Sequence, residues 1–275
     1  MDYKEAHGAR IPALGFGTFM LKPADARRMV EAALEIGYRH IDTAQLYRNE
    51  TDTGAAIAAS GIDRGDIFLT TKVWIERFHA GDLEASADES LERLGTDYVD
   101  LLLLHWPNAD VPLEETLEAL MRVKQAGKAK HIGISNFSTA LVQQAVELVG
   151  AEELVTNQVE YHVFLSQQKI LAQARQFGML VTAYCPLAQG KVVGNETLRA
   201  ISDSHGKSEA QVALRWLLQQ EGVIAIPRTK NEAHARANFE VFDFTLDDAE
   251  MRRIDQLLGD ERQIDPEIAP VWDRP

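Results

Sequence analysis

Short apolar runs alternate along the chain with longer segments in which apolar residues recur at helical spacing. Residues 98–104, YVDLLLL, have the nearly unbroken apolar character of a strand buried on both faces of a sheet. Residues 23–36 have one apolar face, a proline at the start and Gly37 directly after the end, as a helix does. The pattern therefore predicts strands and helices in strict alternation.

Eight strands, each followed by a helix, can be placed on this pattern. The predicted strands cover residues 13–18, 39–41, 67–72, 98–104, 130–134, 155–159, 180–184 and 223–226. The predicted helices cover residues 23–36, 50–59, 82–94, 113–125, 138–148, 167–177, 209–219 and 233–239, with an extra C-terminal helix over 247–258. This count predicts an α/β fold of the (β/α)8 TIM barrel type.

The alternation runs through the chain without a Pro/Ser-rich linker or a charge run, so residues 1–275 are predicted to form a single domain. A doubly wound open sheet is the structural alternative. That fold binds dinucleotides through a G-x-G-x-x-G motif after its first strand. Gly15 and Gly17 lack the third glycine and the acidic partner that the motif requires, which favours the barrel.

Composition narrows the function classes. The net charge of -14 argues against general affinity for nucleic acid or anionic membranes, since both need a basic surface. The sequence has no long apolar run that could span a bilayer, and its first residues lack the apolar core of a secretory signal. A single cysteine, Cys185, excludes an intrachain disulfide and a Cys-based metal cluster. We therefore expect a cytoplasmic protein.

Four side chains that can exchange protons or donate hydrogen bonds stand at the ends of neighbouring predicted strands. Asp42 and Tyr47 follow the second strand, Lys72 ends the third and His105 follows the fourth. Each residue alone has an ordinary structural explanation, such as a cap, a solvated strand end or a core histidine. The ends of barrel strands converge on one face, however, so together the four predict an active site there.

Eight stretches of the sequence resemble, in the same order, the motifs of the aldo-keto reductases, a family of NADPH-dependent barrel enzymes. They are GFGT (15–18), GYRHIDTAQLYRNE (37–50), TKVW (71–74), DLLLLHWP (100–107), GISNF (133–137), NQVEYH (157–162), AYCPL (183–187) and IPRTK (226–230). Within the family, the short loops and the C-terminal APVWD are similar to the bacterial 2,5-diketo-D-gluconate reductases of the B type. A barrel with short substrate loops is therefore expected.

The resemblance implies that Tyr47 is the proton donor for a carbonyl oxygen, with Asp42, Lys72 and His105 around it. Hydride addition places negative charge on that oxygen, which a nearby acid must neutralise. We expect the lysine cation to favour the ionised form of the tyrosine, Asp42 to hold the lysine, and His105 to orient the substrate. No catalytic metal is needed.

The same resemblance implies a site for NADPH. Ser135, Asn136 and Gln158 match the family's ligands for the nicotinamide carboxamide, and Tyr184 matches the residue that stacks on the ring. The remaining cofactor contacts are expected along the pyrophosphate and the 2′-phosphate, from Pro186, Leu187, Arg228, Thr229, Lys230 and Asn238. His234 stands where the family often has arginine, so the strength of the preference for NADPH over NADH stays open.

Trp74, Trp106, Phe19 and Met20 are expected to line the substrate pocket, and Trp272 to close it. Small polar carbonyls suit the short loops: 2-oxoaldehydes, keto sugar acids and keto esters, each reduced to an alcohol by a monomeric enzyme. Two alternatives remain at this point. Lys72 could form a Schiff base in an aldolase or isomerase, or the chain could bind the cofactor as a sensing subunit without turnover.

Overall fold

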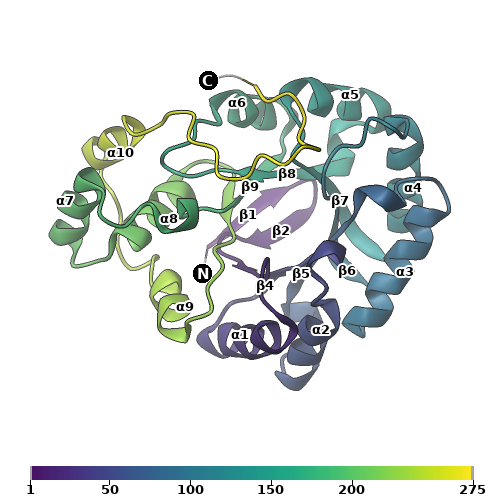
Figure 1. Cartoon of the computed structure of the whole chain (residues 1–275), viewed down its shortest axis with the longest axis horizontal. Helices are drawn as coiled ribbons and strands as arrows, with labels where there is room; N and C mark the ends of the chain where they lie inside the picture. Colours follow the sequence, from purple (N-terminus) through teal and green to yellow (C-terminus); the bar gives the residue numbers. More distant parts are fainter. Residues whose placement is uncertain (1, 274–275) are drawn as a thin grey trace.

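The computed structural model describes residues 2–273, and eight parallel strands form the centre of the molecule (Figure 1). Neighbouring strands in the sheet are also neighbours in the sequence, which is the order that repeated βα units produce. The strands are β3 (Phe16–Gly17), β4 (His40–Asp42), β5 (Phe68–Val73), β6 (Val99–Leu104), β7 (Ala129–Ser135), β8 (Leu154–Glu160), β9 (Leu180–Tyr184) and β10 (Val223–Ala225).

The sheet closes on itself between its first and last strands. Leu14 pairs in parallel with Ala225, the amide of Gly15 donates to the carbonyl of Ala225 at 2.9 Å, and the amide of Ala225 donates to the carbonyl of Ala13 at 2.9 Å. The predicted TIM barrel is thereby confirmed. The predicted first strand is shorter than expected, because only Phe16–Gly17 have regular ladder pairing with β4.

Helices surround this barrel (Figure 1). On α4, for example, Leu117, Leu120 and Val123 recur at helical spacing and are buried against the sheet, whereas the charged residues face outward. The helices are α1 (Pro23–Ile36), α2 (Glu50–Ala59), α3 (Asp82–Leu94), α4 (Leu113–Gln125), α5 (Thr139–Val149), α6 (Gln168–Phe177), α7 (Glu196–His205), α8 (Glu209–Gln219), α9 (Glu232–Phe239) and α10 (Asp248–Asp255).

Alternate residues of β6 point to opposite faces of the sheet. Leu102 and Leu104 belong to the large apolar cluster between the strands and the helices. Leu101 and Leu103 belong to a second cluster inside the barrel, which also contains Ile11 from the N-terminal segment. The barrel interior is therefore packed with side chains rather than open.

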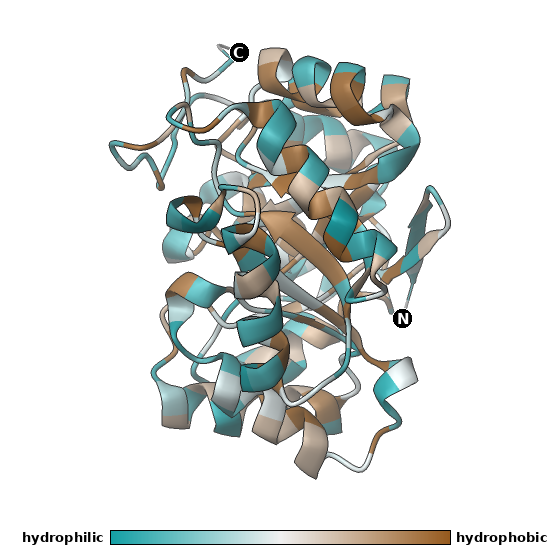
Figure 2. Ribbon diagram, turned by 90° about the vertical axis from the view of Figure 1, so that its right-hand side faces the viewer, coloured by the Kyte–Doolittle hydropathy of each residue, from teal (hydrophilic) through white to brown (hydrophobic). Residues whose placement is uncertain are grey.

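An N-terminal hairpin that the sequence analysis did not predict closes one end of the barrel. Its strands are β1 (Tyr3–Ala6) and β2 (Ala9–Pro12), and its two turn residues, His7 and Gly8, both have positive φ. Looking down the barrel in Figure 1, the hairpin lies behind the strands, and in Figure 2 it stands at the right-hand edge. Ile11 is fully buried there, so the hairpin segment helps to fill this end of the barrel.

Helix α7 was also not predicted, although its signals are present in the sequence. The side chain of Asn195 caps the helix by accepting a hydrogen bond from the amide of Leu198 at 3.1 Å. Gly206, with a φ of 62°, ends it. This helix is the first of two between β9 and β10, so a pattern of one helix per strand does not predict it.

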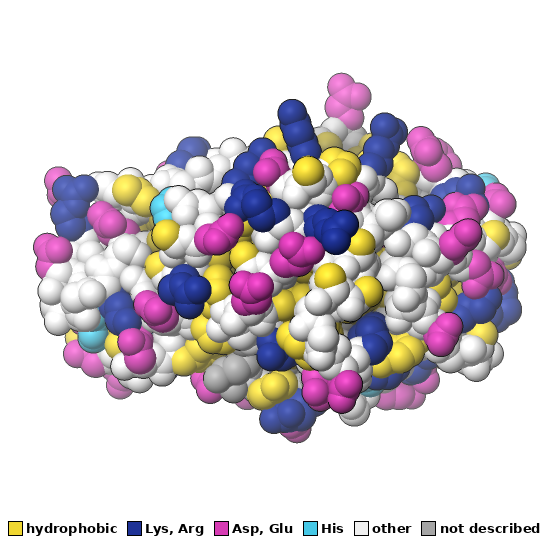
Figure 3. Space-filling view, turned by 90° about the horizontal axis from the view of Figure 1, so that it is seen from below, with side chains coloured by type: hydrophobic (Ala, Val, Ile, Leu, Met, Phe, Trp, Pro, Cys, Tyr) yellow, Lys and Arg dark blue, Asp and Glu magenta, His cyan; other side chains and the backbone are white. Residues whose placement is uncertain are grey.

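The surface carries interspersed charges. On the face shown in Figure 3, Lys and Arg side chains alternate with Asp and Glu over the whole view, with small apolar areas between them. Among the described residues, no helix is both long enough and apolar enough to cross a membrane. On this face no extended field of one sign is visible, so a ligand of either charge depends on local groups.

Candidate active site

Residues with strained backbone conformations lie mainly at the end of the barrel opposite the hairpin. Apart from the turn residue His7, the described non-glycine residues with positive φ all lie in loops that follow the C-terminal ends of strands: Met20, Arg48, Asn136, Cys185, Ala188 and Gln189. Such conformations cost energy and tend to persist at functional sites. They mark the same face of the barrel on which the sequence analysis placed the chemistry.

Lys72 and Asp42 form a buried ion pair at the centre of this face. The ammonium of Lys72, which is 0% exposed, donates to Oδ1 of Asp42 at 2.5 Å and to the carbonyl of Thr43 at 2.9 Å. Burial lowers the pKa of Lys72 from its ordinary value, while Asp42 opposes that change. The other carboxylate oxygen of Asp42 accepts from the side-chain amide of Gln158 at 2.8 Å.

Tyr47 joins this pair to His105. Its hydroxyl lies 3.5 Å from Nζ of Lys72 and 3.5 Å from Nε2 of His105. Three groups that can donate or accept a proton therefore meet around one point at the mouth of the barrel. The structure brings together all four residues that the sequence analysis proposed as catalytic.

The local chain supports the position of Tyr47. The residue ends a short 3-10 helix, Gln45–Tyr47, directly after β4. The buried side chain of Asn49 then ties this loop to the one after β3, because its amide donates to the carbonyls of Thr18 at 2.9 Å and Leu21 at 3.1 Å. Asn49 was not singled out from the sequence, where an asparagine in a loop is an ordinary turn residue.

Electrostatics keep the phenol of Tyr47 neutral. Burial raises the pKa of Tyr47 well above 10.0, and the nearby Asp42 and Tyr184 raise it further. Burial, rather than the neighbouring Lys72 cation, decides the direction of this pKa. Tyr47 thus retains its proton at neutral pH.

His105 is also neutral at physiological pH. Burial lowers the pKa of His105 well below 6.5, and the cation of Lys72 lowers it further. Its ring packs edge-on against Trp74, with 5.3 Å between ring centroids, and its Nδ1 has no hydrogen-bond partner among the described residues. The Nε2 atom faces Tyr47, so it is the atom of the ring available to a ligand at this point.

The predicted nicotinamide ligands form one hydrogen-bonded group beside the ion pair. The hydroxyl of Ser135 donates to the carbonyl of Gln158 at 2.8 Å, and the amide of Asn136 donates to the carbonyl of His105 at 3.0 Å. The hydroxyl of Tyr184 donates to Oδ1 of Asn136 at 2.8 Å. Gln158 lies two residues before the end of β8 rather than at the end, which places it level with Asp42 inside the barrel.

The loop after β9 continues from this group along the rim. Pro186 is buried and Leu187 partly exposed, and the left-handed residues around them turn the backbone sharply. Burial raises the pKa of the Cys185 thiol to about 11, so the thiol is protonated at neutral pH. A protonated thiol is a poor nucleophile.

Residues 226–238 form a locally basic segment, which contacts helix α1 through ion pairs and a hydrogen bond. Arg28 pairs with Glu232 at 2.9 Å and donates to the carbonyl of Lys230 at 3.0 Å, while Lys230 lies 3.7 Å from Asp25. Arg28 was not predicted, because its role depends on a helix more than 200 residues away. Of the other residues expected here, Arg228 and His234 are exposed, Thr229 is half-buried and Asn238 is buried.

Of the aromatic and apolar residues expected at the substrate pocket, some lie near Tyr47 and others near the C-terminal segment. Phe19, 42% exposed, packs on Tyr47 with 5.2 Å between ring centroids, whereas Met20 is 65% exposed at the rim. Trp106 is buried, and its ring lies 6.0 Å from that of Trp272, which brings the C-terminal segment over this edge.

A buried carboxylate holds that segment in place. Glu160, 0% exposed at the end of β8, accepts hydrogen bonds from the amides of Gln263 at 2.7 Å and Ile264 at 2.9 Å. Arg262 stacks on Trp272 at 3.8 Å from the ring centroid. This role of Glu160 has no local sequence signal, since a glutamate in a strand does not reveal which distant amides it will bind.

Comparison with known proteins agrees with the geometry. A model of the aldo/keto reductase family matches residues 13–259, which includes every strand of the barrel. The chain belongs to the aldo/keto reductase family. Methylglyoxal reductase DkgB of Escherichia coli O157:H7 is 42% identical over 266 residues, covering 96% of this chain and 99% of that protein.

Other members of the aldo/keto reductase family are similar over most of the chain. Glyoxal reductase of Bacillus subtilis (strain 168) is 39% identical over 257 residues, covering 93% of this chain and 92% of that protein. A crystal structure provisionally assigned as 2,5-diketo-D-gluconic acid reductase B superposes with a TM-score of 0.97 at 49% identity, covering 99% of this chain and 98% of that one. The family resemblance noted from the motifs is confirmed.

Proposed function

We propose that this aldo/keto reductase uses NADPH to reduce small polar aldehydes and ketones to alcohols. The observation that carries the proposal is the position of the Tyr47 hydroxyl, 3.5 Å from both Lys72 Nζ and His105 Nε2 at the mouth of the barrel. A carbonyl oxygen bound there has two donors in reach, one of which holds a proton that it can release.

Tyr47 acts as the general acid in this proposal. Its raised pKa keeps the proton on the phenol until the carbonyl oxygen gains negative charge. An alkoxide is a far stronger base than a phenolate, so the proton then moves to the substrate oxygen. Lys72, held by Asp42, stabilises the phenolate that remains.

His105 orients the substrate. Because its imidazole is neutral, it can donate from Nε2 only in one tautomer, and a donor at Nε2 aims at the same oxygen as Tyr47. The edge-on packing against Trp74 limits rotation of the ring. Two donors on one oxygen fix the face of the carbonyl that is open to attack.

The residues beside the ion pair fit a nicotinamide cofactor. A carboxamide needs both donors and acceptors, and Ser135, Asn136 and Gln158 supply both within one hydrogen-bonded group. Tyr184 presents its ring at the same edge, where a flat heterocycle can stack. When bound, the cofactor supplies the hydride that the carbonyl carbon receives; the side chains orient its ring and exclude water.

NADPH is preferred in the proposal because the segment around α9 is basic. Arg228 and Arg236 are exposed there, and the carboxylate of Glu232 is already paired with Arg28. Arg228 precedes the N-terminus of α9, whereas Arg236 lies in its last turn. Guanidinium groups suit a 2′-phosphate, and a free 2′-hydroxyl gains less from them. Pro186 and Leu187 border the pyrophosphate, and Thr229, Lys230 and Asn238 complete this half of the site.

The substrates proposed are 2-oxoaldehydes such as methylglyoxal, keto sugar acids and keto esters. The relatives named above as methylglyoxal and glyoxal reductases support the first class, and the provisional diketogluconic acid reductase supports the second. Phe19, Met20, Trp74 and Trp106 form the walls. A monomer remains our prediction for the oligomeric state.

A Schiff base at Lys72 is disfavoured. Its ammonium is fully buried and is bound by Asp42 and by the carbonyl of Thr43, so a substrate carbon has no access to the nitrogen. A cofactor sensor without turnover is disfavoured, because binding a cofactor alone does not require a tyrosine hydroxyl placed between Lys72 and His105. Borohydride trapping and a turnover assay, respectively, test these alternatives.

The decisive experiment titrates the protein with NADPH and NADH by quenching of tryptophan fluorescence, then adds methylglyoxal and follows absorbance of the reduced nicotinamide. We expect tighter binding of NADPH and its oxidation on addition of the carbonyl. Tyr47→Phe should bind NADPH as the wild type does and lose roughly 10²–10⁴-fold in kcat. Full turnover by this variant contradicts the role of Tyr47.

A further inference from the structure

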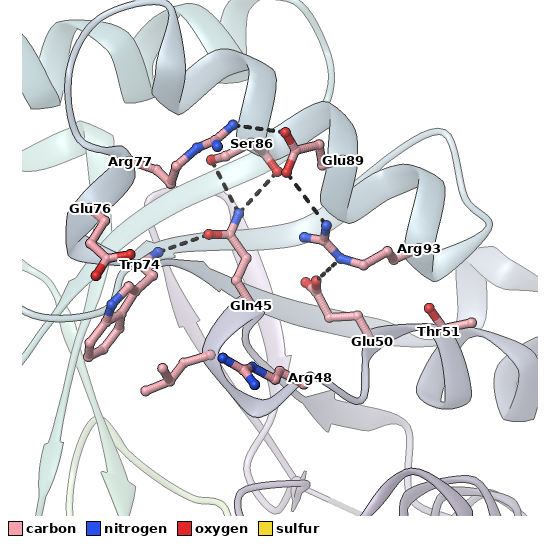
Figure 4. Close-up of a pocket in the computed structure, with 11 residues that line it drawn as sticks. Gln45, Arg48, Glu50, Thr51, Trp74, Glu76, Arg77, Ser86, Glu89 and Arg93 are labelled. Carbon is pink, nitrogen blue, oxygen red and sulfur yellow. Dashed lines mark hydrogen bonds and ion pairs between the residues drawn. The ribbon is translucent and has the colours of Figure 1, made fainter.

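A hollow of about 490 Å³ lies beside the barrel mouth, and Trp74, whose ring packs edge-on against His105, forms part of its lining (Figure 4). The volume is within the range of small-molecule sites. None of the four proposed catalytic residues lines it, but Trp74 borders both spaces. The lining residues are Gln45, Leu46, Arg48, Glu50, Thr51, Trp74, Glu76, Arg77, Ser86, Glu89 and Arg93.

Hydrogen bonds hold the backbone at Trp74, the residue that borders both spaces. Gln45 accepts a hydrogen bond from the backbone amide of Trp74 at 2.9 Å, and its own amide donates to the carbonyl of Ser86 at 3.0 Å (Figure 4). The same amide donates to the hydroxyl of Ser90, also on α3, at 3.0 Å. The same Gln45 begins the short helix that carries Tyr47. The hollow therefore has a fixed geometry relative to the reacting carbonyl.

Some charged side chains around the hollow form ion pairs, and others do not. Arg93 pairs with Glu50 at 2.7 Å and with Glu89 at 3.6 Å, and Arg77 pairs with Glu89 at 2.8 Å. Within residues 2–273, Arg48 has neither an ion pair nor a hydrogen bond from its side chain. Glu76 is the remaining acidic group and is exposed at the rim.

Arg77 also has a hydrogen-bond donor without a partner. Its Nε atom is buried and has no acceptor in the described part of the chain. Buried donors without partners are uncommon in folded proteins and call for an explanation such as a ligand. Arg48 also occupies a strained conformation, with a φ of 53°, directly after Tyr47. Strain of this kind is retained where a side chain must be aimed.

We propose that this hollow is an extension of the substrate site, in which Arg48, supported by Arg77, binds a carboxylate that the substrate carries several bonds away from its carbonyl. The proposal rests on the proposed reductase function and names its substrate class: carbonyl compounds with a distal carboxylate. The carbonyl meets Tyr47, the linking atoms cross the edge of Trp74, and the anion reaches the unpaired guanidinium. Glu76 opposes the anion and limits the affinity.

The test compares 4-carboxybenzaldehyde with its methyl ester, methyl 4-formylbenzoate, which has the same skeleton without the charge. The measured quantity is the ratio of their kcat/KM values with NADPH. Arg48→Asn removes the charge while tolerating the left-handed backbone, and we expect it to lower the ratio roughly three- to tenfold. Arg48→Lys should retain most of the ratio, and Glu76→Gln should raise it.

The opposite directions of the Arg48 and Glu76 variants separate charge recognition from damage to the fold, which would lower activity in both. An unchanged ratio in Arg48→Asn, or a shift in the same direction in both variants, overturns the subsite. Methylglyoxal is assayed in parallel: turnover of methylglyoxal with an unmoved ratio refutes the subsite alone, whereas absence of turnover on all three carbonyls refutes the reductase function and the subsite with it.

Discussion

Gln158 and Lys72 bind the two oxygens of the same buried carboxylate: the amide of Gln158 donates to Oδ2 of Asp42 at 2.8 Å and the ammonium of Lys72 donates to Oδ1 at 2.5 Å. A residue proposed to hold the cofactor is thus connected to the group that supports the proton donor. Strands β8, β4 and β5 meet through this one carboxylate across the barrel.

Replacing Gln158 by leucine should therefore affect both binding and stability. One oxygen of a buried charge loses its donor, which we expect to lower the free energy of unfolding by about 1–3 kcal/mol. The dissociation constant of NADPH should rise roughly tenfold, as measured by fluorescence titration. Gln143→Leu on the exposed face of α5 is the matched control and should change neither quantity. Unaltered NADPH affinity in Gln158→Leu contradicts the carboxamide assignment.

Replacing Lys72 alone should lower the free energy of unfolding more than replacing Lys72 and Asp42 together. Lys72→Met leaves Asp42 buried without its cation, and the free energy of unfolding should fall by roughly 3–5 kcal/mol. The double variant Lys72→Met/Asp42→Leu has no uncompensated charge and should be less destabilised than the lysine variant. Urea unfolding of the wild type, both single variants and the double variant measures the coupling. Additive effects would falsify the view that the pair is one electrostatic unit.

Glu160 should control the order of the C-terminal segment. In Glu160→Gln the amides of Gln263 and Ile264 lose a charged acceptor, a difference of about 1.5–3 kcal/mol. We expect amide hydrogen exchange at these two positions to become at least roughly tenfold faster. Glu147→Gln, on the exposed side of α5, serves as the control. Equal exchange rates in Glu160→Gln and the wild type mean that other contacts hold the segment.

The buried His40 should make the free energy of unfolding fall as the pH is lowered. Burial lowers the pKa of this buried histidine from 6.5 to about 4, so the unfolded chain binds the proton first as the pH falls. Its contribution to stability is complete above pH 6.5 and is lost progressively between 6.5 and about 4, amounting to roughly 2 kcal/mol from pH 7 to 4.5. Urea unfolding at both pH values should show a smaller change in His40→Leu than in the wild type, because the carboxylates contribute alike to both. Parallel pH profiles disprove the assignment.

Much of the barrel could be predicted because its strands and helices differ in length and apolar pattern. Each strand run is short and apolar, and Gly37, Gly95 and Gly178 stop helices where the pattern ends. The convergence of Asp42, Tyr47, Lys72 and His105 followed from the fold, since strand ends share one face. The motifs supplied the roles of the residues, which spacing alone could not.

Other features depend on contacts that local patterns do not encode. The hairpin turns on His7 and Gly8 rather than a common Asn-Gly pair, so its signal was weak. The direction of the Tyr47 pKa depends on how deeply the phenol is buried, which a local sequence pattern does not reveal. Arg28 and Glu160 act on segments distant in sequence, where a charged residue has many equivalent partners.

The hairpin that plugs the barrel has a kinetic consequence. Because the hairpin closes one end and side chains fill the interior, both proposed ligands must bind at the opposite mouth, where the one that lies deeper must arrive first and depart last. If the nicotinamide binds beside Gln158 and the carbonyl above it, as proposed, steady-state kinetics should be ordered, and NADP⁺ should compete with NADPH at every carbonyl concentration. The closed end of the barrel thus sets the sequence of events at the open one.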